Sequence, residues 1–336
     1  MFNKTHRIIG IILVLMSGII AGCSNPLAPP PEPEQVIVQL GWFHTTEFAG
    51  FYVADQKGYY ADENLKVSFV AGGPEIDPVA EVVAGRALFG INAGDSIIRA
   101  RAAQQDVVAI SSIYRQSPLV VMTLPDTGIQ RPQDLVGKTV GVISPAMDTT
   151  WDIQFLGMLN KLKIKSTDLT FVPIEDYHGA NELTAGRMQA VSGFFSSNEP
   201  VQAKLDGHEP TLMFYSDYGI EIYSNAIFTT GQTIRERPEL IERFIRATLK
   251  GYQYAIEHPD EMADLALKYD DTLNADLQSA TMQAQIPLID TGDAPIGTMD
   301  EAVWQITEDI LLEQGIISAP LDLKTVYTNG FVEKAQ

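Results

Sequence analysis

Apolar and polar positions follow two different periods along the chain from Val36 onward. Residues 36–40 (VIVQL) and 65–70 (LKVSFV) alternate and are rich in β-branched residues, which predicts two strands. Between them, residues 48–56 have apolar positions at helical spacing and precede Gly58, which predicts a helix that ends there. Strand and helix patterns continue to alternate over the first two hundred residues. This order predicts an α/β fold with largely parallel sheets.

One pattern occurs twice. Residues 81–90 (EVVAGRALFG) and 182–191 (ELTAGRMQAV) each resemble a helix that stops at glycine and leads into a short apolar strand. A polar loop follows each strand, at residues 92–96 and 196–199. The repetition predicts two similar lobes, although a shared helix stop signal would give the same letters. Because ligands of open α/β sheets bind beyond the carboxyl ends of strands, both loops are expected to line one cleft.

Two extended stretches, Leu119–Leu124 and Tyr218–Phe228, are the expected crossings between the lobes. The first lobe then comprises residues 36–124 and 218–336, and the second lobe is inserted as residues 125–217. The C-terminal part is mostly helical in pattern and is expected to pack on the first lobe.

The N-terminus has the pattern of an export signal. Residues 1–22 contain a basic start and an apolar segment, and Ile20-Ala21-Gly22-Cys23 resembles a bacterial lipobox. Cys23 is the only cysteine of the chain, so an intrachain disulfide is excluded. Acylation of Cys23 would anchor the mature protein on the extracytoplasmic face of the cell membrane. Residues 23–35 carry five prolines and are expected to form an extended tether.

Composition and the absence of catalytic motifs argue against several classes of function. With 43 acidic and 23 basic residues the formal net charge is −20, which argues against a nucleic-acid partner. The five histidines include no pair at metal-ligand spacing, so no metal site is expected. Since a nucleophile elbow, a P-loop and a metalloprotease motif are all absent, no enzyme is expected. A structural or sensory lipoprotein is the alternative class, which the two matched polar loops disfavour.

Several segments together resemble solute-binding proteins related to the thiamine-pyrimidine synthesis and uptake superfamily. They are LGWFHTTEFAGFYVA at 40–54, GYY at 58–60, NLKV at 64–67, QDLVGKTVGV at 133–142 and NEP at 198–200. The resemblance implies a type II periplasmic-binding-protein fold, with two α/β lobes joined by two extended crossings and the ligand enclosed between them. It also implies a transmembrane permease and a cytoplasmic ATPase of an ABC importer as partners, and no cofactor.

Departures from the family pattern bear on the ligand. Members that bind aminopyrimidines resemble W-x-P-N-x-x-H-x-G, whereas this chain has His44, Thr45 and Phe48 at the proline, asparagine and histidine positions. It is more similar to the Q-F-A-G-Y-Y subgroup, which includes riboflavin-binding lipoproteins. That resemblance implies riboflavin, with a thiamine pyrimidine precursor of the hydroxymethylpyrimidine or formylaminopyrimidine type as the alternative. Eukaryotic pyrimidine synthases of the superfamily consume the histidine that Phe48 replaces and use a cysteine-rich stretch that this chain lacks, so the resemblance implies a binding protein.

An alkanesulfonate or nitrate-type anion is the more remote ligand. Such a ligand would need arginine, or a run of serine and threonine, at the strand ends. Residues 144–150 offer only a mixed set of that kind, in which Asp148 stands beside Ser144, Thr149 and Thr150.

The candidate ligand residues lie in the loops beyond the predicted strands. Trp42 and Phe48 could stack on a flat ring. Lobe core is the alternative for both, and it is as good an interpretation as ligand contact for Phe48, whereas ligand contact is favoured for Trp42. Glu199 resembles the carboxylate that pyrimidine binders use, and it would also suit a helix start. Asp95 and Asn198 fit helix caps as well as ligand contacts. The full expected set is Trp42, Thr45, Glu47, Phe48, Asn92, Asp95, Tyr114, Tyr177, Phe195, Asn198 and Glu199.

Overall fold

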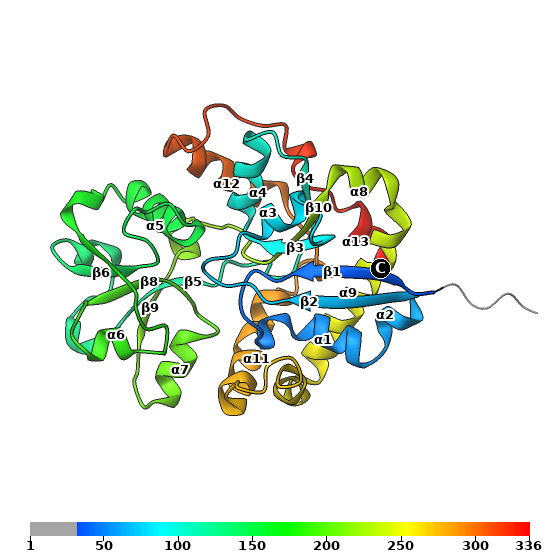
Figure 1. The fold of residues 1–336 in the computed structure, drawn as a ribbon. Coiled ribbons are helices and arrows are strands. Elements are labelled where there is room, and N and C mark those ends of the chain that lie inside the picture. Colours follow the sequence, from blue (N-terminus) through cyan, green and yellow to red (C-terminus); the bar gives the residue numbers. More distant parts are fainter. Residues whose placement is uncertain (1–31) are drawn as a thin grey trace, which may run out of the picture. The chain divides into compact units, whose positions relative to one another are not determined.

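Two five-stranded sheets, each in its own lobe, organise the protein. We use a computed structural model, which describes residues 32–336 (Figure 1). The predicted signal peptide, Cys23 and most of the predicted tether lie outside the described residues. The first sheet has the order β2-β1-β3-β10-β4 and the second β7-β6-β8-β5-β9. Each sheet has two parallel and two antiparallel pairs, so the prediction of largely parallel sheets is wrong. The strand that enters each sheet from the other lobe, β10 in the first and β5 in the second, runs antiparallel to both of its neighbours.

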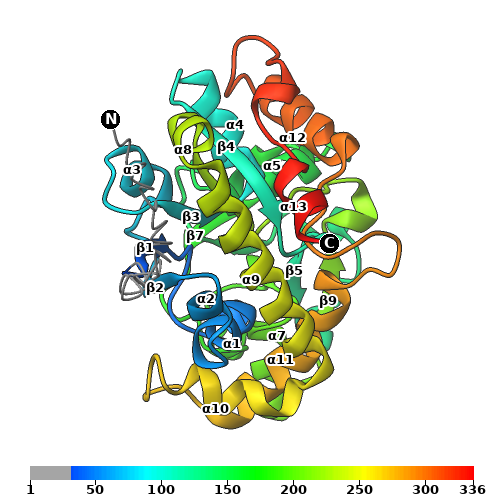
Figure 2. The ribbon, with the colours of Figure 1, turned by 90° about the vertical axis from the view of Figure 1, so that its right-hand side faces the viewer.

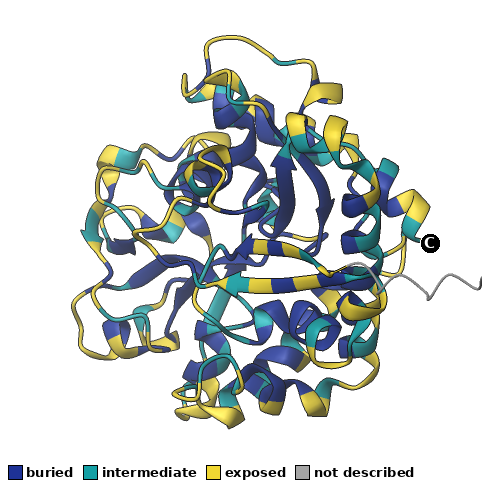
Figure 3. Cartoon of the chain, turned by 45° about the vertical axis from the view of Figure 1, so that its right-hand side comes forward, coloured by how far each residue is buried: buried dark blue, intermediate teal, exposed yellow. Residues whose placement is uncertain are grey.

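The strands of the first sheet are β1 (Glu34–Gln39), β2 (Leu65–Val70), β3 (Phe89–Asn92), β4 (Val107–Ser112) and β10 (Ala226–Thr230). Those of the second are β5 (Leu119–Thr123), β6 (Thr139–Val142), β7 (Thr170–Pro173), β8 (Ala190–Phe195) and β9 (Thr211–Phe214). The inner strands are largely buried, because helices cover both faces of each sheet (Figure 3). The α/β fold with two lobes is therefore confirmed.

The first lobe has the helices α1 (Ala49–Gln56), α2 (Tyr59–Asp62), α3 (Pro78–Val83), α4 (Gly94–Ala102), α8 (Gly231–Glu236), α9 (Pro238–Glu257), α10 (Met262–Ala266), α11 (Ala275–Ile289), α12 (Glu301–Glu313) and α13 (Gly330–Ala335). The second lobe has α5 (Thr150–Lys161), α6 (Asn181–Thr184) and α7 (Glu199–Leu205). Short 3-10 turns are η1 (Thr46–Phe48), η2 (Pro125–Thr127), η3 (Pro132–Leu135), η4 (Ser166–Asp168), η5 (Ser216–Tyr218), η6 (Pro259–Glu261) and η7 (Leu323–Thr325). None of the helices within residues 32–336 is long and apolar enough to cross a membrane.

Helix α9 packs along α1 and α2 at one side of the first lobe (Figure 2). Helices α1 and α9 approach closely because Gly50 of α1 and Gly251 of α9 face each other. A Cβ on Gly251 would lie 2.0 Å from the Gly50 carbonyl oxygen. Phe244 of α9 stacks on Phe89 of β3 with ring centroids 4.1 Å apart. These contacts hold the strands that lead into the cleft against a rigid helical layer.

The chain crosses between the lobes at residues 113–118 and 215–225. The expected crossing at Leu119–Leu124 is wrong in position, because Leu119–Thr123 forms β5, which pairs with both β8 and β9. An apolar extended run has the same pattern in a crossing and in a buried strand, and all five residues of β5 are buried. The second expected crossing likewise includes Ala226–Phe228, which belongs to β10. The backbone N–H of Ser117 donates to Oε1 of Glu221 at 2.6 Å, so the two crossings are hydrogen-bonded to each other.

Two further boundaries differ from expectation. Strand β1 begins at Glu34, inside the predicted tether, because Glu34 pairs with Leu65 at the start of β2. Helix α12 was expected on the first lobe alone, but it contributes to both cores. Trp304 belongs to the first-lobe core and Ile310 to that of the second lobe.

The repeated sequence pattern is a repeated structure. In each copy a short helix, α3 or α6, ends near a glycine of positive φ, +71° at Gly85 and +69° at Gly186. The strand that follows, β3 or β8, is third in its sheet and lies between one parallel and one antiparallel neighbour. Another helix, α4 or α7, then begins at the cleft. The prediction of two similar units is confirmed.

Candidate ligand-binding site

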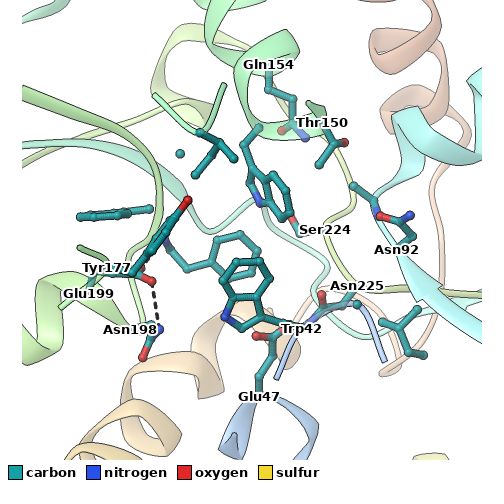
Figure 4. A pocket seen from close by; sticks show the side chains of 18 residues that line it. Trp42, Glu47, Asn92, Thr150, Gln154, Tyr177, Asn198, Glu199, Ser224 and Asn225 are labelled. Atoms are coloured by element: carbon teal, nitrogen blue, oxygen red, sulfur yellow. Dashed lines mark hydrogen bonds between the residues drawn. The ribbon is translucent and has the colours of Figure 1, made fainter. Parts of the chain in front are cut away.

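A pocket lies between the lobes, beyond the carboxyl ends of β1, β3, β6 and β8 (Figure 4). This is the edge at which loops and helix N-termini of an open α/β sheet meet. Its cavity has a volume of about 60 Å³. The lining residues are Gly41, Trp42, Glu47, Ile91, Asn92, Ala93, Ser224 and Asn225 from the first lobe and the second crossing, and Ile143, Thr150, Trp151, Gln154, Tyr177, Gly193, Phe194, Phe195, Asn198 and Glu199 from the second lobe.

Aromatic rings from both lobes meet in this pocket. The Trp42 ring, on the loop after β1, makes edge contacts with Trp151 at 5.7 Å and with Tyr177 at 6.1 Å between centroids. Trp151 lies in the first turn of α5 and Tyr177 in the loop after β7. The three rings thus come from separate elements and surround the same space, an arrangement suited to holding a flat ring system.

Two carboxylates face the pocket from opposite lobes. Glu47 belongs to η1, and Glu199 is the first residue of α7. Glu199 accepts hydrogen bonds from the Phe195 backbone N–H and from Asn198 Nδ2, both at 3.0 Å. Burial raises the pKa of Glu199 to about 7. Burial also raises the pKa of Glu47 to about 7, and repulsion from Glu199 adds to the effect, while the Asn225 amide opposes it.

Three buried polar atoms of the lining have no hydrogen-bond partner within residues 32–336. They are Gln154 Oε1, Ser224 Oγ and Asn225 Nδ2. Each belongs to a residue that is less than a tenth exposed. A buried polar atom without a partner costs about 1–3 kcal/mol. Hydrogen-bonding groups of a ligand would remove that cost, which marks the pocket as a binding site.

Asp95, at the N-terminus of α4, joins the lobes beside the pocket. Its Oδ1 accepts hydrogen bonds from Thr150 Oγ1 and, at 3.3 Å, from Gln154 Nε2, both on α5 of the other lobe. Its Oδ2 forms an ion pair with Arg99 at 3.5 Å. Asp95 is fully buried and does not line the pocket. The residue expected to cap α4 or touch ligand therefore contacts the second lobe instead.

Seven of the expected residues line the pocket: Trp42, Glu47, Asn92, Tyr177, Phe195, Asn198 and Glu199. Besides Asp95, three lie elsewhere. Thr45 caps η1 by accepting the Glu47 N–H at 3.3 Å. Phe48 is fully buried in the first-lobe core, because the η1 turn directs Glu47 to the pocket and the next side chain inward. Tyr114 is also fully buried, and its hydroxyl donates to Gln285 Oε1 at 2.6 Å.

Sequence reasoning missed the contribution of α5 and of the second crossing. Thr150, Trp151 and Gln154 line the pocket from α5, and Ser224 and Asn225 line it just before β10. Trp151 offered a signal, since it directly follows the polar segment considered for an anion. Ser224 and Asn225 offered none, because their place depends on β10 returning to the middle of the first sheet.

The loop considered for an anion already binds one of the chain's own carboxylates. The backbone N–H groups of Ile143 and Ser144 donate to Asp152 at 3.0 Å and 2.8 Å, and Thr149 Oγ1 donates to the same side chain. The donors that an external anion would need are therefore occupied.

Comparisons with known proteins agree with this architecture. The chain is 26% identical to the riboflavin-binding protein RibY of Chloroflexus aurantiacus, over 96% of each chain. It is also 26% identical to the formylaminopyrimidine-binding protein of Halalkalibacterium halodurans, over 90% of this chain and 92% of the other. A 4-amino-5-hydroxymethyl-2-methylpyrimidine phosphate synthase of Legionella pneumophila is 23% identical, over 89% and 92%.

Among solved structures, the periplasmic aliphatic sulphonate binding protein SsuA of Escherichia coli matches with a TM-score of 0.68. The alignment covers 89% of this chain and 99% of that one at 15% identity, a likeness of fold. Binding of a small ligand for transport is the role that the two binding proteins and this fold support together. The family model described as NMT1/THI5 like matches residues 45–262. The chain thus belongs to the NMT1/THI5-like family.

Proposed function

We propose that this chain is the lipid-anchored substrate-binding component of an ABC importer, which captures riboflavin between its lobes and delivers it to a permease. The observation that carries the proposal is the pocket lining: aromatic rings from both lobes, two carboxylate acceptors and several free amide and hydroxyl groups. The protein would act as a carrier and not as an enzyme.

The three aromatic residues support a ligand with a large flat ring. An aromatic contact contributes about 0.5–1.5 kcal/mol beyond area burial, and Trp42, Trp151 and Tyr177 together offer several such contacts to a tricycle. A cavity of about 60 Å³ holds only a few water molecules, so these rings must separate before a tricycle can enter. Separation of the rings means separation of the lobes that carry them. This favours capture by opening and closing.

The polar groups suit the remainder of such a ligand. The hydroxyl groups of a ribityl chain can donate to Glu199 and exchange hydrogen bonds with Asn198. The ring carbonyl and N–H groups can pair with Asn225 Nδ2 and Gln154 Oε1, both buried and unpartnered among the described residues. Pairing removes their desolvation cost and so favours the bound state.

An aminopyrimidine of the thiamine pathway is the second candidate. One observation favours it: Glu47, Glu199 and Gln154 Oε1 are all acceptors, which match the N–H donors of an amino-substituted ring. The formylaminopyrimidine-binding relative has the same level of identity as the riboflavin-binding one. Riboflavin is the preferred candidate because aromatic residues from three elements line the pocket, which suits a larger flat ring than that of a pyrimidine.

Titration of purified protein with riboflavin tests the ligand. We expect quenching of flavin fluorescence with a Kd below about 1 μM, weakened at least tenfold in Trp42→Ala. Tyr59→Ala is the control, because Tyr59 is a partly exposed aromatic residue of the same lobe and lies outside the pocket lining. Absence of quenching together with tight binding of an aminopyrimidine would replace riboflavin by the second candidate.

Anchoring through Cys23 rests on the lipobox resemblance, and Cys23 lies outside the described residues. Cys23→Ala should release the protein from membranes, which fractionation followed by immunoblotting measures. Ser24→Ala leaves the acylated residue in place and is the control. Continued membrane retention of the Cys23→Ala protein would rule out the anchor.

A further inference from the structure

The charged residues of the pocket lining are all acidic. Among the lining residues the only side chains that carry a formal charge are Glu47 and Glu199, and no lysine, arginine or histidine of residues 32–336 joins them. They approach the pocket from different lobes, so any enclosed ligand lies in the field of both. Charge of one sign in a low-dielectric cleft acts strongly on a charged ligand.

Within residues 32–336, no cationic side chain is among the groups that shift the pKa of Glu47. The groups that interact with it electrostatically are Glu199 and the tyrosines Tyr52, Tyr114 and Tyr252, together with the Asn225 amide. Tyr252 donates its hydroxyl to the backbone oxygen of Glu47 at 3.3 Å, not to the carboxylate. A carboxylate in such surroundings is costly to ionise unless a ligand supplies donors or positive charge.

The other acidic groups near the cleft have partners of their own and bring no positive charge into the pocket. Asp152 occupies the N–H donors of the loop after β6, and Asp95 is paired with Arg99. Arg99 does not line the pocket. A phosphate or sulfonate entering the cleft would therefore meet two carboxylates without a compensating cation.

We propose that Glu47 sets the charge preference of the pocket: with Glu199 it forms a two-carboxylate filter that accepts neutral or positively charged, donor-rich ligands and excludes phosphorylated forms of them. This inference rests on the proposed function, because it concerns the same site. Rejection by like charge is a way to separate two ligands that share a ring system. Glu199 is held by its own lobe through Phe195 and Asn198, whereas the side-chain donor beside Glu47 is the Asn225 amide of the second crossing. Glu47 is therefore the residue whose charge can be changed without breaking a contact to its own strand ends.

The experiment compares riboflavin with riboflavin 5′-phosphate by fluorescence titration. The wild-type protein should bind riboflavin roughly tenfold or more tightly than its phosphate, a difference of about 1.4 kcal/mol. The titrations are made above pH 8, where Glu47, with its pKa raised to about 7, is ionised. Glu47→Gln keeps the shape of the side chain and removes this charge, so affinity for the phosphate should rise at least threefold while that for riboflavin changes less. A purely structural role of Glu47 would weaken binding of both ligands. Glu75→Gln, an exposed change in the same lobe, should leave the ratio unaltered.

Several outcomes separate the two proposals. Equal binding of riboflavin and its phosphate by the wild-type protein would overturn the filter and leave the proposed function standing. If riboflavin does not bind, hydroxymethylpyrimidine and its phosphate are compared in the same variants by calorimetry, with the same expected ratios. Failure of both pairs to bind would overturn the proposed function and the filter with it.

Discussion

Strands β3 and β8 have the same place in their sheets, yet the acidic residues that follow them have different partners. Both strands follow a short helix and a glycine of positive φ, and both lead to a helix that begins at the cleft. After β3, Asp95 is fully buried and accepts hydrogen bonds from Thr150 and Gln154 of the other lobe. After β8, Glu199 faces the pocket, and its hydrogen-bond donors within residues 32–336 all belong to its own lobe.

The difference shows that position in the fold does not determine the role of a residue. Equivalent strand ends place an acid at the cleft in both lobes, because the same topology is used twice. What each acid does depends on the donors opposite it. Thr150 on α5 lies against Asp95 and engages it, whereas the described residues opposite Glu199 include the acidic Glu47. Asp95 therefore links the two lobes, whereas Glu199 remains available to a ligand.

The largest effect that this comparison predicts is on stability. Asp95→Ala leaves the buried donors Thr150 Oγ1 and Gln154 Nε2 without an acceptor, at about 1–3 kcal/mol each, so it should lower the free energy of unfolding by about 3 kcal/mol. Glu199→Ala should cost clearly less, because its pocket side has no protein partner among residues 32–336. Urea denaturation of both variants measures the difference. Equal losses of unfolding free energy in the two variants would contradict the conclusion that Asp95, but not Glu199, links the lobes.

The next effect is a pH dependence assigned to Glu199. Its pKa is raised from 4.5 to about 7 in the folded protein, so the folded state binds more protons than the unfolded state between these values. Stability from this group is present below pH 4.5 and is lost as the pH rises through 7. Glu199→Gln should therefore gain about 1–3 kcal/mol relative to wild type between pH 5 and pH 8.

The measurement for this prediction is the difference between the two unfolding free energies at each pH. Taking the difference cancels the carboxylates that both proteins share, apart from Glu47, whose pKa should fall when the Glu199 charge is removed. Glu209→Gln, an exposed change in the same lobe, is the control. A wild-type-to-variant difference that stays constant from pH 5 to pH 8 would contradict the assignment.

The smallest predicted effect concerns closure. Thr150→Val keeps the side-chain shape but removes the hydroxyl that donates to Asp95 across the cleft. Loss of one buried hydrogen bond costs about 1 kcal/mol, so ligand affinity should fall roughly fivefold through weaker closure. Thr170→Val, on exposed β7, should leave affinity unchanged. An unaltered ligand affinity of the Thr150→Val protein would show that the Asp95 contact does not contribute to closure.

Much of the fold could be predicted because the pattern that encodes it is local. The alternation in 36–40, the helix stops at Gly85 and Gly186, and the polar loops after β3 and β8 depend only on near neighbours in the chain. The wrong prediction of a crossing at β5 also arose because only local patterns were available. The segment LVVMT has no local feature that distinguishes a crossing from a buried strand. Pairing with β8 and β9 decides it, and that pairing joins residues about 70 to 95 positions apart.

The candidate site was predictable in part for the same reason. Trp42, Glu47 and Glu199 lie next to strand ends that the pattern located. Phe48 could not be separated from Glu47, because only the η1 turn decides which of two neighbours faces the pocket. Ser224 and Asn225 depend on the position of β10 among distant strands, and no local signal carries that information.

The insertion of β10 between β3 and β4 has a consequence for how the chain folds. The first sheet cannot close until residue 230 has been made, whereas the strands of the second sheet are all contained in residues 119–214. Pairs so far apart in sequence form slowly, because a long loop must be ordered first. The strands of the second sheet can therefore pair while the first sheet remains incomplete, although the second-lobe core is filled only when Ile310 of α12 joins it. The sheet that supplies Trp42, Asn92 and Asn225 to the pocket is therefore completed late in folding, after the strands that supply the opposite wall.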